Sequence, residues 1–237
     1  MIFEEPPGDY AWLFDLVATD PVTRHRALDR HQAMVAAASD ALHRSNALWL
    51  SHYRSRSSQP RLRAAMDQAH ADFRWHDRQT IYGPLGAFRD AADGDGVTRA
   101  LWAPFVVLYL RWEADFPEEW QAPESRMWSP WGTKEALLRR LDRDVIPEGI
   151  KPQIAELILA ALRRPYRCKD WGYACLVRQL DDPLFLDRVA MLARADDPLV
   201  QLDDPLVQLR VQFVLHLVAH PEQRITRTSW RRWLRTA

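Results

Sequence analysis

The sequence contains little cysteine and glycine and carries no net charge. Its two cysteines, Cys168 and Cys175, form neither a C-x-x-C redox pair nor a four-ligand metal set, so we expect reduced structural thiols. Eight glycines among 237 residues are too few for a fold rich in β-hairpins, and no sustained alternation of β-branched residues predicts a strand. With 32 basic and 32 acidic residues, no overall field draws the chain to nucleic acid or to an anionic membrane.

Long apolar runs and targeting signals are also scarce. The longest apolar runs, among them Phe105–Leu110 and Val211–Ala219, are too short to span a bilayer. Met1–Pro7 is acidic and interrupted by proline, whereas a signal peptide has a basic start followed by an apolar run. The sequence therefore predicts a cytoplasmic protein without a membrane-spanning helix.

Motifs of the familiar enzyme classes are missing. The chain has no nucleophile elbow, P-loop, dinucleotide-binding glycine pattern or H-E-x-x-H pair. We therefore assign no catalytic residue and no cofactor from the sequence.

Helical periodicity, by contrast, runs through the whole chain, and it is clearest near the N-terminus. Asp20 can cap a helix whose first residue is Pro21, and no proline or glycine follows until Pro60. This pattern predicts a long helix over 21–55. A second helix over 62–80 is expected to fold back on it as an antiparallel hairpin.

Two regions are expected, residues 1–96 and 97–237, packed as one continuous unit. Glycines and prolines in 81–96 predict a loop with at most a short helix. A helix is expected over 97–115, interrupted by Pro104, which should start or kink the helix at that point. Prolines also bracket the polar segment 116–130, which we expect to be an ordered loop at the junction of the two halves.

Short amphipathic helices follow this junction. Apolar residues at helical spacing predict helices over 131–145, 152–162, 170–180, 183–192 and 205–219. The last of them is apolar almost all round, so we expect neighbouring helices on both of its sides. The chain is thus predicted to be all-α, with the hairpin followed by stacked antiparallel helix pairs.

A repeated heptapeptide draws attention to the same part of the chain. D-D-P-L-V-Q-L occurs at 196–202 and again at 203–209. Seven residues cannot form a helical hairpin, so this copy is interpreted as a local duplication that lengthens one loop. The wider spacing between the Asp-Asp-Pro runs at 181–183 and 203–205 fits one helix plus its connection.

These features give the segment 131–220 a resemblance to HEAT-repeat proteins. In that family an Asp in the turn within a repeat precedes a Val and a basic residue on the second helix. Here Asp204 and Val207 match, Gln208 stands where the basic residue is usual, and Arg210 follows two places later. The resemblance implies an α-solenoid of stacked helix pairs and implies no particular activity.

Tryptophan is abundant around the proposed junction, where acidic residues interleave it. Large rings at this place could wedge two helical layers together, or they could form an aromatic and acidic pocket for a cationic or planar ligand. The candidate ligand-binding residues are Trp112, Glu113, Asp115, Glu119, Trp120, Trp128, Trp131 and Trp171.

Three functional hypotheses follow. The leading one is a non-enzymatic scaffold that offers its repeat groove to a protein partner, with Arg178 and Arg210 at the rim. The alternative is a HEAT-like DNA glycosylase or a resistance protein that recognises alkylated DNA or a planar cation through the tryptophan and acid cluster. Nucleic-acid binding is disfavoured by the neutral net charge, and the best basic patch is Arg231 and Arg232 in the C-terminal tail. That tail could instead form a capping helix with its tryptophans buried.

The third hypothesis is a metal-dependent helical bundle at the N-terminus. Asp40 and His43, like Asp67 and His70, are three residues apart, and Asp72 and His76 lie close by in the sequence. The glutamates typical of di-iron bundles are missing, so we interpret these residues as surface groups and assign no metal site.

Overall fold

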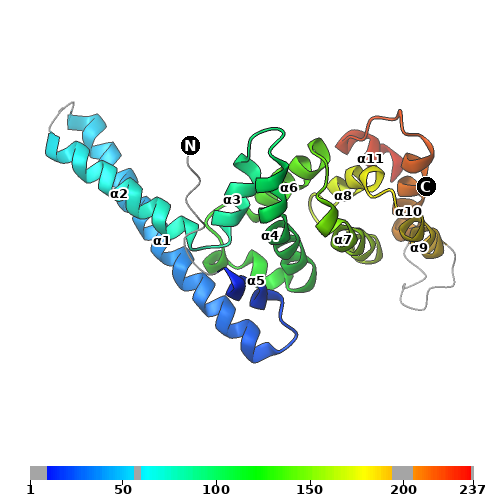
Figure 1. Cartoon of the computed structure of the whole chain (residues 1–237), viewed down its shortest axis with the longest axis horizontal. Coiled ribbons are helices and arrows are strands. Elements are labelled where there is room, and N and C mark those ends of the chain that lie inside the picture. The colour runs from blue at the N-terminus through cyan, green and yellow to red at the C-terminus, as the bar shows by residue number, and fades with distance from the viewer. Residues whose placement is uncertain (1–9, 56–59, 194–204, 236–237) are drawn as a thin grey trace. The chain divides into compact units, whose positions relative to one another are not determined.

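The structure is a computed structural model that describes residues 10–55, 60–193 and 205–235 (Figure 1). All regular structure in these ranges is helical, and no strand occurs in them, which confirms the predicted all-α class. In the same ranges no helix has the length and apolar character needed to cross a membrane. The chain forms two compact units, which are described separately: unit 1 from Met1–Ala91 and Arg111–Pro130, and unit 2 from Ala92–Leu110 and Trp131–Ala237.

Unit 1 is built on the predicted hairpin. Helix α1 (Pro21–Ser55) pairs with α2 (Pro60–Arg78). Asp20 caps α1, since its Oδ2 accepts hydrogen bonds from the backbone N and the Oγ1 of Thr23 at 2.9 and 2.6 Å. The buried positions along the hairpin are small or flexible, which lets the helices approach closely; they include Ala38, Ala41, Met66 and Ala69.

Shorter helices cover only the first half of α1. They are η1 (Ala11–Val17), α5 (Pro117–Gln121) and η2 (Pro123–Ser125). The loop end of the hairpin extends away from η1, α3 and α5 in Figure 1. One end of α1 therefore packs against these short helices of unit 1, and the other end packs against α2 of the same unit.

The segment 81–96 contains a more extensive helix than predicted. Helix α3 (Tyr82–Asp90) has nine residues and begins where the Thr80 Oγ1 accepts the backbone N–H of Tyr82 at 3.1 Å. Gly83 permits this tight turn, because a Cβ there would lie 2.6 Å from the carbonyl oxygen of Arg78. The glycine thus serves the close approach of α2 and α3 and does not break the helix.

Helix α4 (Gly96–Asp115) contributes its first part to unit 2 and its last residues to unit 1. Its bounds match the helix predicted over 97–115 to within one residue, and Pro104 lies inside it and does not start it. The segment 116–130, predicted to be a loop, holds the short helices α5 and η2 and belongs to unit 1.

The helices of unit 2 follow the predicted succession closely. They are α6 (Pro130–Arg143), η3 (Glu148–Ile150), α7 (Lys151–Arg163), α8 (Trp171–Leu176), η4 (Val177–Gln179), α9 (Pro183–Ala193), α10 (Pro205–Ala219) and α11 (Arg227–Trp233). Helix α10 contacts α7, α9 and α11, as its apolar circumference predicted. The helix predicted over 170–180 is divided into α8 and η4. The first heptapeptide copy and the start of the second lie outside the described residues.

Candidate functional site

The tryptophans of the predicted pocket divide between core and surface. Trp112 and Trp120 are buried in unit 1, and Glu113 between them in sequence is fully buried. The ring of His31 meets Trp112 edge-on, with 5.3 Å between centroids. These two tryptophans fill the core of unit 1, as expected for rings that wedge helices together.

The remaining acidic candidates of unit 1 are engaged in ion pairs. Arg24 Nε lies 3.3 Å from Glu119 Oε1, and its guanidinium stacks 4.0 Å from the ring centroid of Phe116. Asp115 lies 3.3 Å from Arg111 one turn earlier on α4. Trp128 is exposed at the surface. The charges that a cationic ligand would need are thus neutralised by arginines.

Trp131 and Trp171 belong to unit 2. Trp171 lines a hollow of about 20 Å³ together with Glu135, Asp142 and Cys175. Because ligand pockets usually measure about 300–1,000 Å³, this hollow has room for one or two water molecules and not for a planar ligand.

A buried ionic network lies at the centre of unit 2. Asp170, just before α8, accepts hydrogen bonds from Lys134 Nζ at 2.7 Å and from Arg164 Nη1 at 2.9 Å. The backbone N–H of Arg167 donates to the same carboxylate at 2.8 Å. Lys134 Nζ also lies 5.4 Å from the ring centroid of Trp131 and 5.2 Å from that of Tyr173. The buried ion pairs of Asp170 with Lys134 and Arg164 therefore link α6, α7 and α8.

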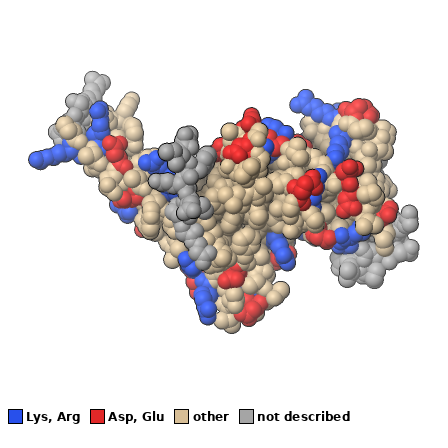
Figure 2. Space-filling model, viewed as in Figure 1, with Lys and Arg blue, Asp and Glu red and all other residues tan. Residues whose placement is uncertain are grey.

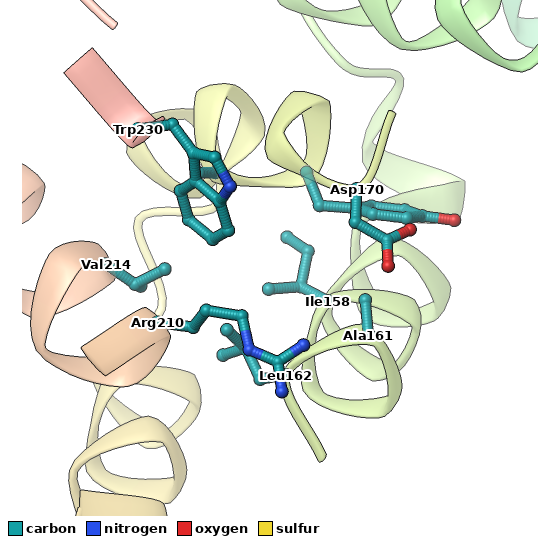
Figure 3. A pocket seen from close by; sticks show the side chains of 9 residues that line it. Ile158, Ala161, Leu162, Asp170, Arg210, Val214 and Trp230 are labelled. Carbon is teal, nitrogen blue, oxygen red and sulfur yellow. The ribbon is translucent and has the colours of Figure 1, made fainter. Parts of the chain in front are cut away.

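A small cavity borders this network (Figure 3). Its volume is about 10 Å³, which accommodates one water molecule. It is lined by Ile158, Ala161, Leu162, Asp170, Tyr173, Ala174, Arg210, Val214 and Trp230. Polar and apolar groups from α7, α8, α10 and α11 surround the cavity. It is a gap in the packing of these helices and is too small to bind a substrate.

The two arginines expected at a groove rim have structural roles in unit 2. Arg210 is only 2% exposed, because its Nε donates to the Leu206 carbonyl at 3.0 Å and its Nη1 to the Arg164 carbonyl at 2.9 Å. Arg178 donates to the carbonyls of Leu217, His220 and Gln223 at 2.8–3.1 Å, and so caps the end of α10. Their hydrogen bonds tie helices together.

The C-terminal helix α11 packs through its tryptophans. Trp230 meets Phe213 edge-on at 5.0 Å between centroids, and Trp233 Nε1 donates to the Leu209 carbonyl at 3.0 Å. Thr226 and Ser229 form a capping box at its start. Arg231 and Arg232 are exposed, which is the arrangement expected of a capping helix.

The histidine and aspartate pairs of the hairpin do not converge on a metal geometry. In the described ranges no group of three or more His, Cys, Asp or Glu side chains could hold a metal ion. His43 and His70 are exposed, and Asp72 accepts a hydrogen bond from Gln68 at 2.7 Å.

A surface that the predictions did not include lies at the loop end of the hairpin. Trp49, Leu50 and Tyr53, close together on α1, are 56%, 57% and 84% exposed. We call these three residues the hairpin patch. Arg44, Arg61 and Arg63 are exposed at the same end of the hairpin, where Figure 2 shows basic side chains in blue, but helical spacing places Arg44 on the face of α1 opposite Trp49 and Tyr53. The sequence around the patch is basic, since residues 41–66 contain five arginines and no Asp or Glu.

Comparison with known proteins supplies no relative. No protein-family model, curated protein or solved structure matches this chain. The HEAT-like resemblance therefore rests on the residues of this sequence alone.

Proposed function

We propose that this chain is a non-enzymatic helical scaffold that binds a partner protein on the hairpin patch. The observation that carries the proposal is the exposure of Trp49, Leu50 and Tyr53 near the loop end of the hairpin, which extends away from η1, α3 and α5 in Figure 1. Large apolar side chains gathered at one place on a surface are a feature of interaction sites, whereas single exposed ones are ordinary.

The composition of the patch supports a protein partner. Interface cores are enriched in Trp and Tyr and depleted of Lys, Asp and Glu, and the hairpin patch consists of Trp49, Leu50 and Tyr53. Burial of each exposed apolar side chain would add about 1.5–3 kcal/mol at full coverage. Three such side chains at the centre of a contact can therefore dominate its affinity.

The small-molecule and DNA-repair alternatives find less support. Both need an open pocket beside tryptophan and carboxylates, whereas Trp112 and Trp120 are buried and the acids nearby are paired with arginine. The hollows of about 10 and 20 Å³ in unit 2 are too small for a base or a planar cation. Protein binding is therefore the function that we propose.

The scaffold itself is proposed to be HEAT-like over 131–220. The succession of amphipathic helices from α6 to α10 supports this proposal, as do the contacts of α10 with α7 and α9. We further propose a cytoplasmic location, on the sequence features described above.

Site-specific photo-crosslinking tests the binding proposal. A benzophenone amino acid is placed at Leu50 of the full-length chain in its own cells, with a control at Val145 of unit 2, which is 78% exposed. We expect one protein to crosslink at position 50 and not at 145. The purified partner should then bind the purified chain, with affinity reduced about tenfold or more by Trp49→Ala with Tyr53→Ala.

Leu101→Ala, which removes a comparably exposed side chain from α4, is the matched control for that binding measurement. If the partner binds the wild type and the double variant equally, or if positions 50 and 145 give the same adducts, the hairpin patch is not a protein-binding site.

A further inference from the structure

Two histidines lie side by side where α10 ends. His216 is in the last turn of the helix, and His220 directly follows the helix, four residues later. Their ring centroids are 4.1 Å apart, with the His216 side chain half-buried and the His220 side chain exposed. Among the eight histidines of the chain no other two are so close in sequence, since the next smallest spacing is six residues. Two imidazole rings are thus in contact at one surface site of unit 2.

The hydrogen bond within the pair determines which nitrogen of His220 can bind a ligand. His220 Nδ1 lies 2.9 Å from the backbone carbonyl oxygen of His216. A carbonyl oxygen can only accept, so Nδ1 carries the hydrogen, and the lone pair of the neutral ring is on Nε2. Histidines that bind metal ions usually donate their other ring N–H in this way, which fixes the tautomer and orients the ring. The His220 ring is therefore in a form that can bind a metal ion.

The ring of His216 is held by α11. It stacks on Trp233, with 4.8 Å between centroids and 28° between the ring planes. Trp233 is itself anchored, because its Nε1 donates to the Leu209 carbonyl at 3.0 Å. The backbone at His220 is fixed by Arg178, whose Nη2 donates to the His220 carbonyl at 2.8 Å. Both histidines are therefore held in place before a ligand binds, which lowers the entropy cost of binding.

The ligand type and the spacing favour a transition-metal ion. Side chains four residues apart on a helix face the same way, and the two zinc ligands of the H-E-x-x-H motif have this spacing. Two nitrogens bound to one zinc ion at about 2.0–2.1 Å lie about 3.4 Å apart at the tetrahedral angle, which is within reach of a small rotation of the exposed His220 ring. Imidazole suits Zn²⁺, Cu²⁺ and Ni²⁺, whereas Mg²⁺ and Ca²⁺ prefer oxygen ligands.

The pair does not have the other groups of a hydrolytic zinc site. Leu217, which is buried, stands where the H-E-x-x-H motif has the glutamate that acts as general base. In the part of the chain that the structure describes, no third His, Cys, Asp or Glu completes a metal-binding group with the two histidines. Water molecules would fill the remaining coordination positions. The arrangement therefore suits reversible binding of an ion and not catalysis by it.

We propose that His216 and His220 form a binding site for a divalent transition-metal ion of the zinc and copper class. The site lies in unit 2 and does not depend on the proposed function of the hairpin patch in unit 1. The ion holds the two rings at the end of α10 together and, through the stacking of His216 on Trp233, strengthens the contact of α10 with α11. Because the unfolded chain does not keep the two rings together, binding of the ion stabilises the folded protein.

Titration of the whole chain, without a histidine tag, with Zn²⁺ tests the proposal. Calorimetry should show saturable binding with which excess Mg²⁺ does not compete. His220→Ala, at an exposed ring, should weaken Zn²⁺ binding about tenfold or more. His220→Cys supplies a thiolate ligand at the same place and should restore the binding. The matched control, His25→Ala with His70→Ala, removes two exposed histidines of α1 and α2 and should leave the affinity within about twofold.

Thermal unfolding gives a second measurement. Zn²⁺ should raise the thermal midpoint of the wild type and leave that of His220→Ala unchanged, and circular dichroism checks that this variant remains helical.

Four outcomes would overturn the proposal. The first is no saturable binding of Zn²⁺ to the wild type below about 1 mM. The second is equal affinity of the wild type and His220→Ala, and the third is equal weakening in the control variant. The fourth is a loss in His220→Ala that His220→Cys does not reverse, since the substitution would then act through packing and not through a lost ligand.

Discussion

Lys134 Nζ lies 2.7 Å from Asp170 Oδ1, and both side chains are almost completely removed from solvent. The second cation at this carboxylate, Arg164, approaches from the end of α7. Removal of two charges from water costs free energy, which is recovered only when their hydrogen bonds are well formed. The pair therefore fixes how α6, α7 and α8 pack inside unit 2 more than it adds stability.

Removal of one member of this pair is expected to be costly. Lys134→Met leaves Asp170 buried with one cation fewer and should lower the free energy of unfolding by about 3–5 kcal/mol. The control is Arg188→Ala, which breaks the exposed pair with Glu156 and should cost at most about 1 kcal/mol. Urea titration followed by circular dichroism measures both, and similar losses in the two variants would contradict a buried role for Lys134.

Acid sensitivity is expected from His31 in the core of unit 1. Burial lowers the pKa of His31 to about 4, although the hydrogen bond from Nε2 to the Ser125 carbonyl acts in the opposite direction. In the unfolded chain His31 takes up a proton near pH 6.5, whereas in the folded protein it does so only near pH 4. The stability that the folded protein gains from neutral His31 is therefore complete above pH 6.5 and is lost as the pH falls from 6.5 to 4. The loss amounts to about 3 kcal/mol.

Unfolding titrations between pH 4 and 8 measure this dependence. His31→Gln should remove most of the slope between pH 6.5 and 4, whereas His70→Gln, at an exposed position of α2, should keep it. If the free energy of unfolding of His31→Gln still falls between pH 6.5 and 4, groups other than His31 cause the acid sensitivity.

Close packing at Gly172 gives a third prediction. A Cβ on this residue would lie 2.9 Å from Leu138 Cδ1 and 3.2 Å from Leu138 Cβ, so Gly172→Ala should displace the Leu138 side chain in the contact of α6 with α8 and cost about 1 kcal/mol. Gly86 in α3 has no atom within 4 Å of such a Cβ, and Gly86→Ala should instead stabilise by about 0.5–1 kcal/mol. Thermal midpoints of the two variants should therefore move in opposite directions.

The two cysteines are expected to differ in reactivity. Cys168 is exposed, whereas burial, together with the nearby Asp142, raises the pKa of Cys175 to about 12. A pKa three units above the ordinary value of 9 means about a thousandfold less thiolate at neutral pH. Reaction of the native protein with a chromogenic disulfide should titrate one thiol quickly, and Cys168→Ser should abolish that phase while urea restores reaction at Cys175.

Several features of the fold follow directly from the sequence. The helix over 21–55 could be predicted because Asp20 and Pro21 act locally, and because no proline or glycine interrupts the following turns. The face of α7 that is buried, with Ile154, Leu157 and Ile158, follows from helical spacing alone. Local rules failed where a tertiary contact decided the outcome, as at Gly83, whose role depends on the carbonyl of Arg78.

The candidate site could not be predicted in the same way. Neighbours in sequence could not show that Trp112 and Trp120 are buried while Trp49 is exposed, because the two buried tryptophans are flanked by polar residues and Trp49 stands between Leu48 and Leu50. Likewise, the sequence predicted that Arg210 lies at the rim of a binding groove. It is buried instead, because it donates a hydrogen bond to the carbonyl of Arg164, 46 residues earlier.

The sequence by itself determined the all-helical class, the hairpin and the starts of most helices, since capping, proline and periodicity operate within a few residues. It also contained the basic run 41–66. Only the tertiary structure decided which aromatic and charged side chains are covered, because burial depends on contacts between segments far apart in the chain. It is this selective coverage that leaves Trp49, Leu50 and Tyr53 exposed and so defines the surface on which we expect a partner to bind.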